Sequence, residues 1–289
     1  MDAVFQPLFV DPIDHASLRF DGAWTNGMWQ DGWLHSENDA IWPVRAGIPD
    51  FVRRAFDGAR WTYADVRGLL AGGQYRRNWE GQNGLPRDTS GFGQAVRRAA
   101  IGCEPIVDVA SGPGGGAMPF IVQLNPDAHV LAVDAGTPVL YGWREYLAAE
   151  RPDAKVSFAG FDFTHAPFRD DSIGIITSIC GFSNIIDQSR AWREAARILK
   201  PDGEILAFEM YWDPDGRKRL ADALAEPHIA SDDGLTIRDR IEAAGLVIKE
   251  EFLGAGRPLR ADDNELAARA AELGIEVWLR NAKYVITKT

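Results

Sequence analysis

From residue 104 onward, short apolar runs alternate with longer stretches in which apolar residues recur at helical spacing. The runs are rich in valine and isoleucine, as buried strands are, and most of the intervening stretches have the pattern of amphipathic helices. Strands are predicted at Ile106–Val109, Val130–Val133, Val156–Phe158, Ile173–Ser178, Glu204–Phe208, Leu246–Glu250 and Tyr284–Ile286. Helices are predicted at Val139–Glu150, Gln188–Leu199 and Thr236–Ala244. This alternation predicts an α/β fold, with a parallel sheet covered by helices on both faces.

The first 60 residues follow a different pattern. Turn dipeptides at Asn26-Gly27 and Asp31-Gly32 separate short apolar pieces, which predicts a small β-hairpin or meander. Tryptophan is concentrated in this part of the chain, because six of the ten tryptophans precede residue 80. We expect these rings to fill a core or an interface, with an aromatic binding wall as the alternative.

Residues 61–103 have a helical pattern that glycines interrupt at several points. Such a segment is either a plain connector or a lid that folds over a neighbouring site. Tyr75 lies within it and would face a bound ligand if the segment is a lid. The sequence therefore predicts three parts: a tryptophan-rich β module (1–60), a helical lead-in or lid (61–103) and an α/β domain (104–289).

The overall charge narrows the range of partners. The formal net charge is −11 and the pI is near 5.0, so binding to nucleic acid or to an anionic membrane is not expected. The amino terminus does not resemble a secretory signal, and no apolar run approaches the roughly 18 residues of a membrane span. Cys103 and Cys180 are too far apart in sequence to indicate a metal site or a disulfide framework. These features favour a cytoplasmic protein and leave its oligomeric state open, a homodimer included.

The stretch PIVDVASGPGGGAM, from Pro105 to Met118, passes from a predicted strand into a glycine-rich loop. A phosphate-binding P-loop would end in Gly-Lys-Ser/Thr, and this loop contains no lysine. A dinucleotide-binding loop is closer, because Asp134 follows at about the spacing of a ribose-binding acid. Asp108, however, would place a carboxylate beside the pyrophosphate. A ligand that has a cationic group and no phosphate satisfies both observations, and S-adenosylmethionine is such a ligand.

Several blocks, in the same order, resemble class I S-adenosylmethionine-dependent methyltransferases of the type 11/25 kind. VDVASGPGGG is similar to their motif I and VLAVDAG to their motif II. AGFDFTHAPFRDDSIGIITS and SICGFSNIIDQSRAWREAARILKPDGEILAFE resemble the next blocks, and IEAAGLVIKEE and NAKYVITKT resemble the last two strands. The resemblance implies a Rossmann-like sheet of seven mostly parallel strands with an antiparallel last strand, and S-adenosylmethionine as the cofactor. Gly174 departs from the family, where many members have an aspartate.

The resemblance also implies roles for single residues. Asp134 would accept hydrogen bonds from both ribose hydroxyls, Asp162 would accept one from the adenine amine, and Phe163 would supply a backbone amide. Asp108 has a structural alternative, as a cap for the helix after the loop. The residues expected to bind the cofactor are Asp108, Ala110, Gly112, Gly114, Asp134, Ala135, Asp162, Phe163 and Ser178.

The methyl acceptor is expected beyond the carboxyl ends of the fourth and fifth strands, because open α/β sheets bind their ligands there. An oxygen acceptor of high pKa would need a general base, whereas a carboxylate, a thiol or an aromatic nitrogen can react without one. The side chains expected to contact the acceptor are Phe182, Asn184, Tyr211 and Trp212. The candidate bases are Glu209, His165 and Tyr75, with Tyr211 a further candidate.

Each of these candidates has a structural alternative. His165 would be a loop histidine in contact with solvent, and Glu209 would be an acceptor of structural hydrogen bonds. Asn184 would cap the next helix, and Cys180 would be a small apolar filler because no neighbouring cation lowers its pKa.

The stretch WPVRAGIPDFV, near the end of the β module, resembles the small zinc-ribbon-derived domain that activates several methyltransferases. No cysteine precedes residue 103, so no metal is expected and tryptophan packing would have to replace it. The sequence predicts a methyltransferase that modifies O, N or C of a small or medium organic metabolite or a peptide, with residues 1–60 shaping the acceptor site or a partner surface. The alternatives are an RNA methyltransferase with a metal-free ribbon and a non-catalytic, methyltransferase-like binding subunit.

Overall fold

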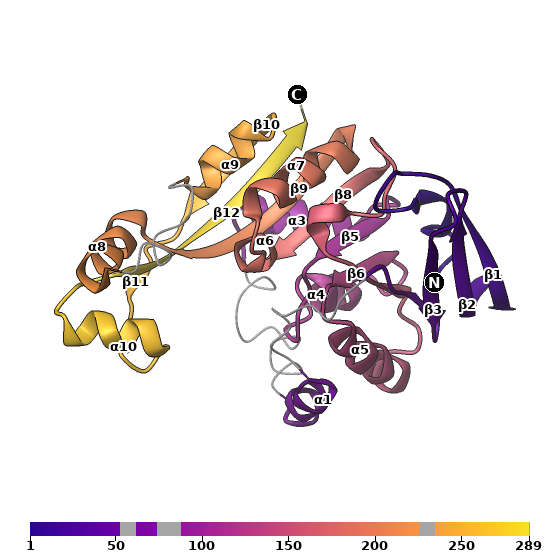
Figure 1. Cartoon of the computed structure of the whole chain (residues 1–289), viewed down its shortest axis with the longest axis horizontal. Coiled ribbons are helices and arrows are strands. Elements are labelled where there is room, and N and C mark those ends of the chain that lie inside the picture. Colours follow the sequence, from indigo (N-terminus) through magenta and orange to yellow (C-terminus); the bar gives the residue numbers. More distant parts are fainter. Residues whose placement is uncertain (53–61, 74–87, 226–234, 289) are drawn as a thin grey trace.

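A computed structural model of the protein describes residues 1–52, 62–73, 88–225 and 235–288. Its main feature is a large sheet in the order β10-β12-β9-β8-β5-β6-β7, with β11 paired to β12 (Figure 1). Strands β5 to β9 pair in parallel, and β12 is antiparallel to both of its neighbours. The strands are β5 (Ile106–Val109), β6 (Val130–Asp134), β7 (Val156–Gly160), β8 (Ile173–Ile179), β9 (Leu199–Trp212), β10 (Leu246–Leu253), β11 (Arg257–Pro258) and β12 (Trp278–Lys288). The predicted fold class, with an antiparallel last strand, is confirmed.

Strand β9 is much longer than the predicted Glu204–Phe208. It continues beyond the sheet together with β12, and the pairing runs as far as Trp212 opposite Leu279. The departure at Gly174 also has a local cause. A Cβ atom at this position would lie 2.5 Å from the Glu104 carboxylate, which pairs with Lys200 at 2.9 Å. Gly174 therefore makes room for a surface ion pair and has no part in the site.

Helices cover both faces of the sheet. One face carries α1 (Tyr63–Ala71), α3 (Gly91–Ile101), α4 (Met118–Leu124) and α5 (Thr137–Glu150), whose apolar residues form one buried cluster with the strands. The opposite face carries α7 (Gln188–Ile198) and α9 (Ile237–Ala243), in a second cluster. In α7 this pattern is strong, because Ala191, Trp192 and Ala195 are buried while Arg190 and Arg193 are exposed.

A second sheet precedes the large one, as predicted for the amino-terminal segment. Its four antiparallel strands lie in the order β1 (Leu18–Thr25), β2 (Met28–Ser36), β3 (Ile41–Arg45) and β4 (Ile48–Pro49), after the short turn η1 (Gln6–Leu8). The Asn26-Gly27 turn joins β1 to β2, and both of its residues have positive φ, as a tight hairpin requires.

Two details of this module differ from the sequence-based expectation. Asp31-Gly32 is not a turn, because it lies inside β2 with Gly22 and Gly32 directly opposite each other. An added Cβ on Gly22 would lie 2.6 Å from the Gly32 Cα, so the two glycines permit a close approach of the strands. Trp29 and Trp42 fill the core as expected, whereas Trp24 and Trp33 are 54% and 50% exposed.

The amino-terminal module is part of the core of the large domain. The connection from β7 to β8, residues 161–172, contains only the short turn η3 (Phe163–His165) and no α-helix to cover the sheet. Phe9 and Phe51 lie there instead, in one buried cluster with Val133 and Phe161 of the sheet. The module thus supplies the missing layer at the β7 edge (Figure 1). The expectation that it shapes the acceptor site finds no support in this position, because β7 is the edge strand farthest from β9.

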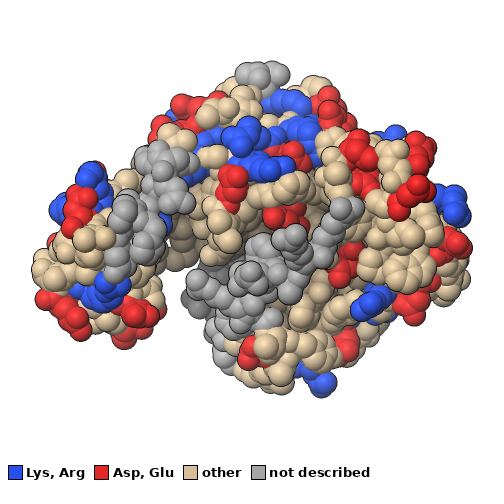
Figure 2. Space-filling model, in the orientation of Figure 1, with Lys and Arg blue, Asp and Glu red and all other residues tan. Residues whose placement is uncertain are grey.

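A small lobe lies at the other end of the molecule, where the β9–β12 ribbon leaves the sheet (Figure 1). It contains α8 (Pro214–Leu224) and α10 (Glu265–Glu272), held by a small apolar cluster that includes Leu220 and Val277. On the face drawn in Figure 2, acidic side chains lie among the basic ones. None of the helices that the structure describes is long and apolar enough to cross a membrane.

Candidate functional site

The glycine-rich loop begins where β5 ends, at Asp108. This side chain is fully buried and accepts hydrogen bonds from Thr177 Oγ1 at 2.7 Å and from the amides of Ala117 and Met118 at 3.1 Å. These amides lie at the start of α4, whose N-cap residue offers no side-chain acceptor of its own. Burial raises the pKa of Asp108 to about 6, against the opposing effect of its hydrogen bonds. The capping alternative for Asp108 therefore describes its observed contacts.

Asp134, at the end of β6, joins the loop to the neighbouring strand. Its two carboxylate oxygens accept from the Gly112 amide at 2.9 Å and from the Gly136 amide at 2.7 Å. Burial raises the pKa of this carboxyl. Ala135, the next residue, is half-buried beside it. Asp134 is the one acid that connects the first two predicted motifs directly.

The loop glycines fall into two kinds. A Cβ atom on Gly115 would lie 2.6 Å from the Trp143 ring, and one on Gly116 would lie 2.3 Å from the Asp108 carboxylate, so both are required by packing. Gly112 and Gly114 border open space instead, since an added Cβ has no neighbour closer than 3.7 Å at the first and none within 4 Å at the second. The open pair marks the surface of the loop that a ligand can approach.

This difference makes a testable prediction for two single methyl groups. Gly116→Ala should lower the free energy of unfolding by about 1–3 kcal/mol, because the new Cβ meets a buried carboxylate and the residue has a φ of +56°. Gly114→Ala should leave the unfolding midpoint unchanged and weaken binding of S-adenosylhomocysteine. Urea unfolding and calorimetry on both variants check this. Equal losses of stability would contradict the division.

Asp162 and Phe163 follow β7, at the same carboxyl ends of the parallel strands as Asp108 and Asp134. The Asp162 carboxylate accepts from the Thr164 amide at 2.9 Å and so caps the short turn η3. Phe163 is buried. His165 is exposed, and its Nδ1 atom lies 2.9 Å from Thr164 Oγ1. The structural alternative for His165, a loop histidine near solvent, matches this position.

The turn after β8 is fixed by a buried polar chain. Ser178 Oγ accepts from the Gly181 amide at 3.1 Å and donates to Glu209 Oε1 at 2.7 Å. The second Glu209 oxygen accepts from the Ser183 amide at 2.9 Å. This holds the one-turn helix α6 (Gly181–Asn184), which starts after Cys180 in the left-handed conformation, with φ at 58°. A non-glycine residue in this conformation is a form of backbone strain that is concentrated at functional sites.

Glu209 is 0% exposed, and burial raises its pKa. With both oxygens engaged, it holds α6 in place and does not reach the surface of the site. Burial, together with the neighbouring Glu209 carboxyl, raises the pKa of the Cys180 thiol to about 12, which agrees with the expectation of an inert cysteine. Asn184 is exposed and donates to the Cys180 carbonyl at 2.6 Å. It does not cap the next helix, because Asp187 does so.

A cavity of about 440 Å³ opens directly beyond the end of β9. Tyr211 and Trp212 line it from the strand, and residues of α8, the start of α9 and Gln188 at the start of α7 line it from the other sides. Burial raises the pKa of the Tyr211 phenol, so it stays protonated at neutral pH and can donate a hydrogen bond. Tyr211 and Trp212, both predicted to contact the acceptor, therefore line the same cavity.

The other predicted residues have different positions. Phe182 is 1% exposed and stacks on Trp192 with 3.8 Å between the ring centroids, so it belongs to the core. Ala110 lies half-buried in the loop with φ at +47°. Tyr75 lies outside the described residues. Among the described residues, no group of three or more histidine, cysteine, aspartate or glutamate side chains is arranged to hold a metal ion.

Sequence reasoning missed three supporting residues. Thr177 holds Asp108, the Ser183 amide holds Glu209, and Trp143 Nε1 donates to the Gly112 carbonyl at 3.1 Å. Thr177 precedes Ser178 in a strand, and Trp143 lies in the middle of a helix. Neither position carries a local signal, because both contacts join elements that are distant in sequence.

Comparison with known proteins finds a family match over the part of the chain that contains the glycine-rich loop and the strands that follow it. Residues 107–207, from β5 to β9, match the family profile described as "Methyltransferase domain". The chain is similar to a demethylmenaquinone methyltransferase of Clavibacter sepedonicus (33% identity, covering 40% of this chain and 45% of that protein). It is also similar to a ubiquinone/menaquinone biosynthesis C-methyltransferase of Dinoroseobacter shibae (31%, covering 57% and 60%). The chain thus spans about half the length of the curated relatives it matches.

Among solved structures, the chain is similar to an arsenic(III) S-adenosylmethionine methyltransferase of Chlamydomonas reinhardtii. The TM-score is 0.48, with 16% identity over 71% of this chain and 72% of that one. The family match begins at Val107 and includes the glycine loop, Asp134, Asp162 and Ser178. Together with the strand order and the antiparallel β12, it identifies the core of this chain as a class I S-adenosylmethionine-dependent methyltransferase domain.

Proposed function

We propose that the protein transfers a methyl group from S-adenosylmethionine to a carbon atom of a small organic acceptor bound beyond β8 and β9. The observation that carries this proposal is the link between the open glycine loop and the acid of the next strand, Gly112 to Asp134 at 2.9 Å. The preference for carbon comes from the name of the relative in Dinoroseobacter shibae, a ubiquinone/menaquinone biosynthesis C-methyltransferase.

The residues of the loop and of the two following strands fit the cofactor. Gly112 and Gly114 leave room for close approach to the backbone. Asp134 would accept from the ribose hydroxyls with the lone pairs that its two amide contacts leave over, and Asp162 would accept from the adenine amine. Asp108 would act through the loop that it fixes. When bound, the cofactor supplies an electrophilic methyl group together with its own leaving group.

The acceptor would occupy the cavity beside Tyr211 and Trp212. The phenol of Tyr211 would donate a hydrogen bond to an acceptor oxygen, and the Trp212 ring would pack against an apolar or aromatic face. Glu209 would fix the position of α6 and of the turn before it through its hydrogen bonds with Ser178 and Ser183. His165 is not among the residues that line the cavity, which come from β9, α8, the start of α9 and Gln188 at the start of α7, so we favour Tyr211 as the polar contact. Within the protein, catalysis would rest on positioning and exclusion of water.

The experiment is label transfer from S-adenosylmethionine to a panel of small hydroquinones, phenols, enolisable ketones and short peptides. With the acceptor that is labelled, Tyr211→Ala should raise KM by about tenfold, the scale of one lost hydrogen bond to a buried group. Binding of S-adenosylhomocysteine should stay unchanged. Lys200→Ala, at the opposite ends of the strands, is the matched control. If Tyr211→Ala leaves the KM for the acceptor unchanged, the acceptor does not bind in this cavity.

Two alternatives make different predictions. An RNA methyltransferase would need a basic surface, but the net charge is −11, and binding that weakens steeply with salt would be its signature. A non-catalytic binding subunit would bind S-adenosylhomocysteine and transfer no label to any acceptor or cell extract.

A further inference from the structure

The segment that carries Asp162 and Phe163 is held at both ends by the amino-terminal module. At its start, the Phe51 amide donates to the Gly160 carbonyl at 2.7 Å. At its end, the chain runs antiparallel to residues 8–10: the Val10 amide donates to the Pro167 carbonyl at 2.9 Å, and the Arg169 amide donates to the Leu8 carbonyl at 3.1 Å. Three main-chain hydrogen bonds between the amino-terminal module (residues 8–10 and 50–51) and the residues on either side of 161–166 thus hold this segment at both ends. We refer to these contacts as the clamp.

Side-chain packing reinforces both ends of the clamp. The Phe9 ring lies 5.1 Å from the Phe168 ring and 5.7 Å from the Phe51 ring, so one side chain joins the two ends. All three rings are buried. The start of the clamp also adjoins the ribose-binding acid, because Gly160 pairs with Asp134 between β7 and β6.

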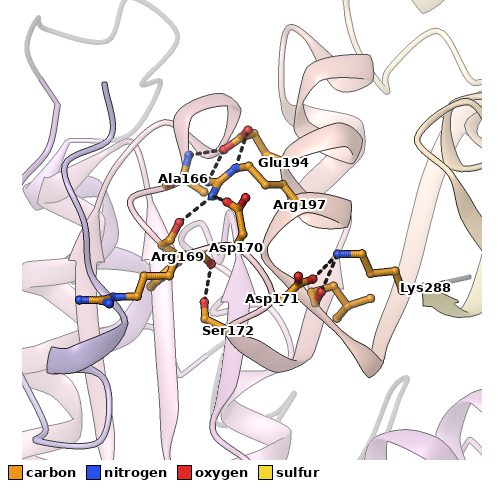
Figure 3. A network of polar contacts seen from close by, with 10 residues as sticks. Ala166, Arg169, Asp170, Asp171, Ser172, Glu194, Arg197 and Lys288 are labelled. Carbon is orange, nitrogen blue, oxygen red and sulfur yellow. Dashed lines mark hydrogen bonds and ion pairs between the residues drawn. The ribbon is translucent and has the colours of Figure 1, made fainter. Parts of the chain in front are cut away.

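A second set of contacts holds the end of the segment from the opposite side, from α7 (Figure 3). Arg197 donates to the carbonyls of Ala166 and Phe168 at 2.8 and 2.7 Å, and Glu194 accepts from the Ala166 amide at 3.1 Å. Arg197 and Glu194 also pair with each other at 2.8 Å. The end of the segment therefore lies between α7 and the amino-terminal module, whereas its start is held by the module and by β6.

A segment without its own helix or strand loses conformational entropy when a ligand fixes its backbone, and this loss weakens binding of the ligand. Fixing the backbone of one residue costs about 1–2 kcal/mol, so a segment ordered beforehand binds more tightly than one that must be ordered by the ligand. Residues 161–166 contain only the three-residue turn η3. Their order therefore comes from contacts with other elements. Besides the contacts at the two ends, Arg190 Nε donates to the Thr164 carbonyl at 2.8 Å, and the Phe163 ring packs against the Phe182 ring with 5.7 Å between the centroids.

We infer that the clamp is a positioning device for the cofactor: residues 8–10 and 50–51 set the position of Asp162 and Phe163 and thereby the affinity for the adenine end of S-adenosylmethionine. This inference rests on the proposed function for the identity of the ligand. It assigns to the amino-terminal module a part in cofactor binding, at the β7 edge, rather than in acceptor choice.

The test uses two substitutions at one exposed position. Arg169→Pro removes the amide that donates to Leu8, while Arg169→Ala keeps it and removes only an exposed side chain. Phe168 forms an extended bridge with Phe9, a conformation that a following proline tolerates. Amide hydrogen exchange of residues 162–166 is measured in the free protein, and the affinity for S-adenosylhomocysteine is measured by calorimetry.

For Arg169→Pro we expect faster exchange in this segment and about fivefold weaker binding than for Arg169→Ala, the scale of one backbone hydrogen bond. Equal affinity of the two variants for S-adenosylhomocysteine would overturn the inference, whether both bind as tightly as the wild-type protein or both bind more weakly by the same factor. If Arg169→Pro does not fold, Phe51→Pro against Phe51→Ala makes the same comparison at the other end, because both remove the ring and only the proline removes the amide that donates to Gly160. If the wild-type protein does not bind S-adenosylhomocysteine, the proposed function fails, while the exchange rates still show whether the clamp orders the segment.

Discussion

Deletion of residues 1–52 is expected to abolish cooperative folding of the whole protein. The module covers the sheet where no helix does, and its loss would expose Val133, Phe161 and Phe168 to water. Burying one such side chain is worth roughly 1.5–3 kcal/mol, and a domain is stable by only about 5–15 kcal/mol in total. Far-ultraviolet circular dichroism during urea unfolding should show no sharp transition for the shortened chain.

The matched control for the deletion lies on the outer face of the same module. Trp33 is half exposed and opposite Pro43, so Trp33→Ala should change the free energy of unfolding by less than about 1 kcal/mol. A shortened protein that unfolds cooperatively and still binds S-adenosylhomocysteine would show that residues 1–52 are an accessory module. Such a result would support the original expectation of a separate part.

Asp134→Ala is expected to weaken binding of S-adenosylhomocysteine by about 10- to 100-fold. The change removes a charged acceptor, worth about 1–3 kcal/mol, and it leaves the amides of Gly112 and Gly136 without their carboxylate. Asp134→Asn should lose less, because the remaining amide oxygen can serve one of the two contacts. Calorimetric titration of the three proteins gives the comparison.

Asp153→Ala provides the control for this variant. Asp153 is an exposed acid that follows α5 and pairs only weakly with Arg151, at 3.4 Å. Its removal changes the net charge by the same amount and should not alter the affinity. If Asp134→Ala and Asp153→Ala bind alike, the ribose assignment of Asp134 is wrong.

Strand and helix positions in the large domain followed closely from the hydrophobic pattern. Each predicted strand overlaps an observed one. The signal was strongest for the parallel strands β5 to β9, because strands buried on both faces give continuous apolar runs. The end of β9 could not be predicted in this way. Its residues beyond Phe208 pair with β12 outside the main sheet, where one face is exposed and the apolar run stops.

The first two motifs were also predictable, because Asp134 and the glycine loop lie close together in sequence and have a known spacing. The role of Glu209 was not. Its carboxylate is buried under Ser178 and Ser183, and a sequence shows neither burial nor the partner of a hydrogen bond across 31 residues. Phe182 was misplaced for the same reason, since its stacking on Trp192 depends on how α6 meets α7.

The packing of the amino-terminal module against the large sheet could not be predicted from the sequence either. Its hairpin followed from Asn26-Gly27, but nothing local indicates that Phe9 and Phe51 cover a distant strand. The clue was the β7–β8 connection, residues 161–172, which is interrupted by Pro167 and contains only the short turn η3 in place of a covering helix. A sheet face that lacks a helix needs another cover, and the earlier segment of the chain provides it.

The most direct measurement for the whole account is a calorimetric titration of the wild-type protein with S-adenosylhomocysteine, beside parallel titrations with NAD and ATP. We predict saturable binding of one S-adenosylhomocysteine molecule per chain and no binding of the two phosphate-containing ligands, since the loop has no lysine and Asp108 lies behind it. Binding of NAD or ATP in preference to S-adenosylhomocysteine, or no saturable binding of S-adenosylhomocysteine, would contradict it.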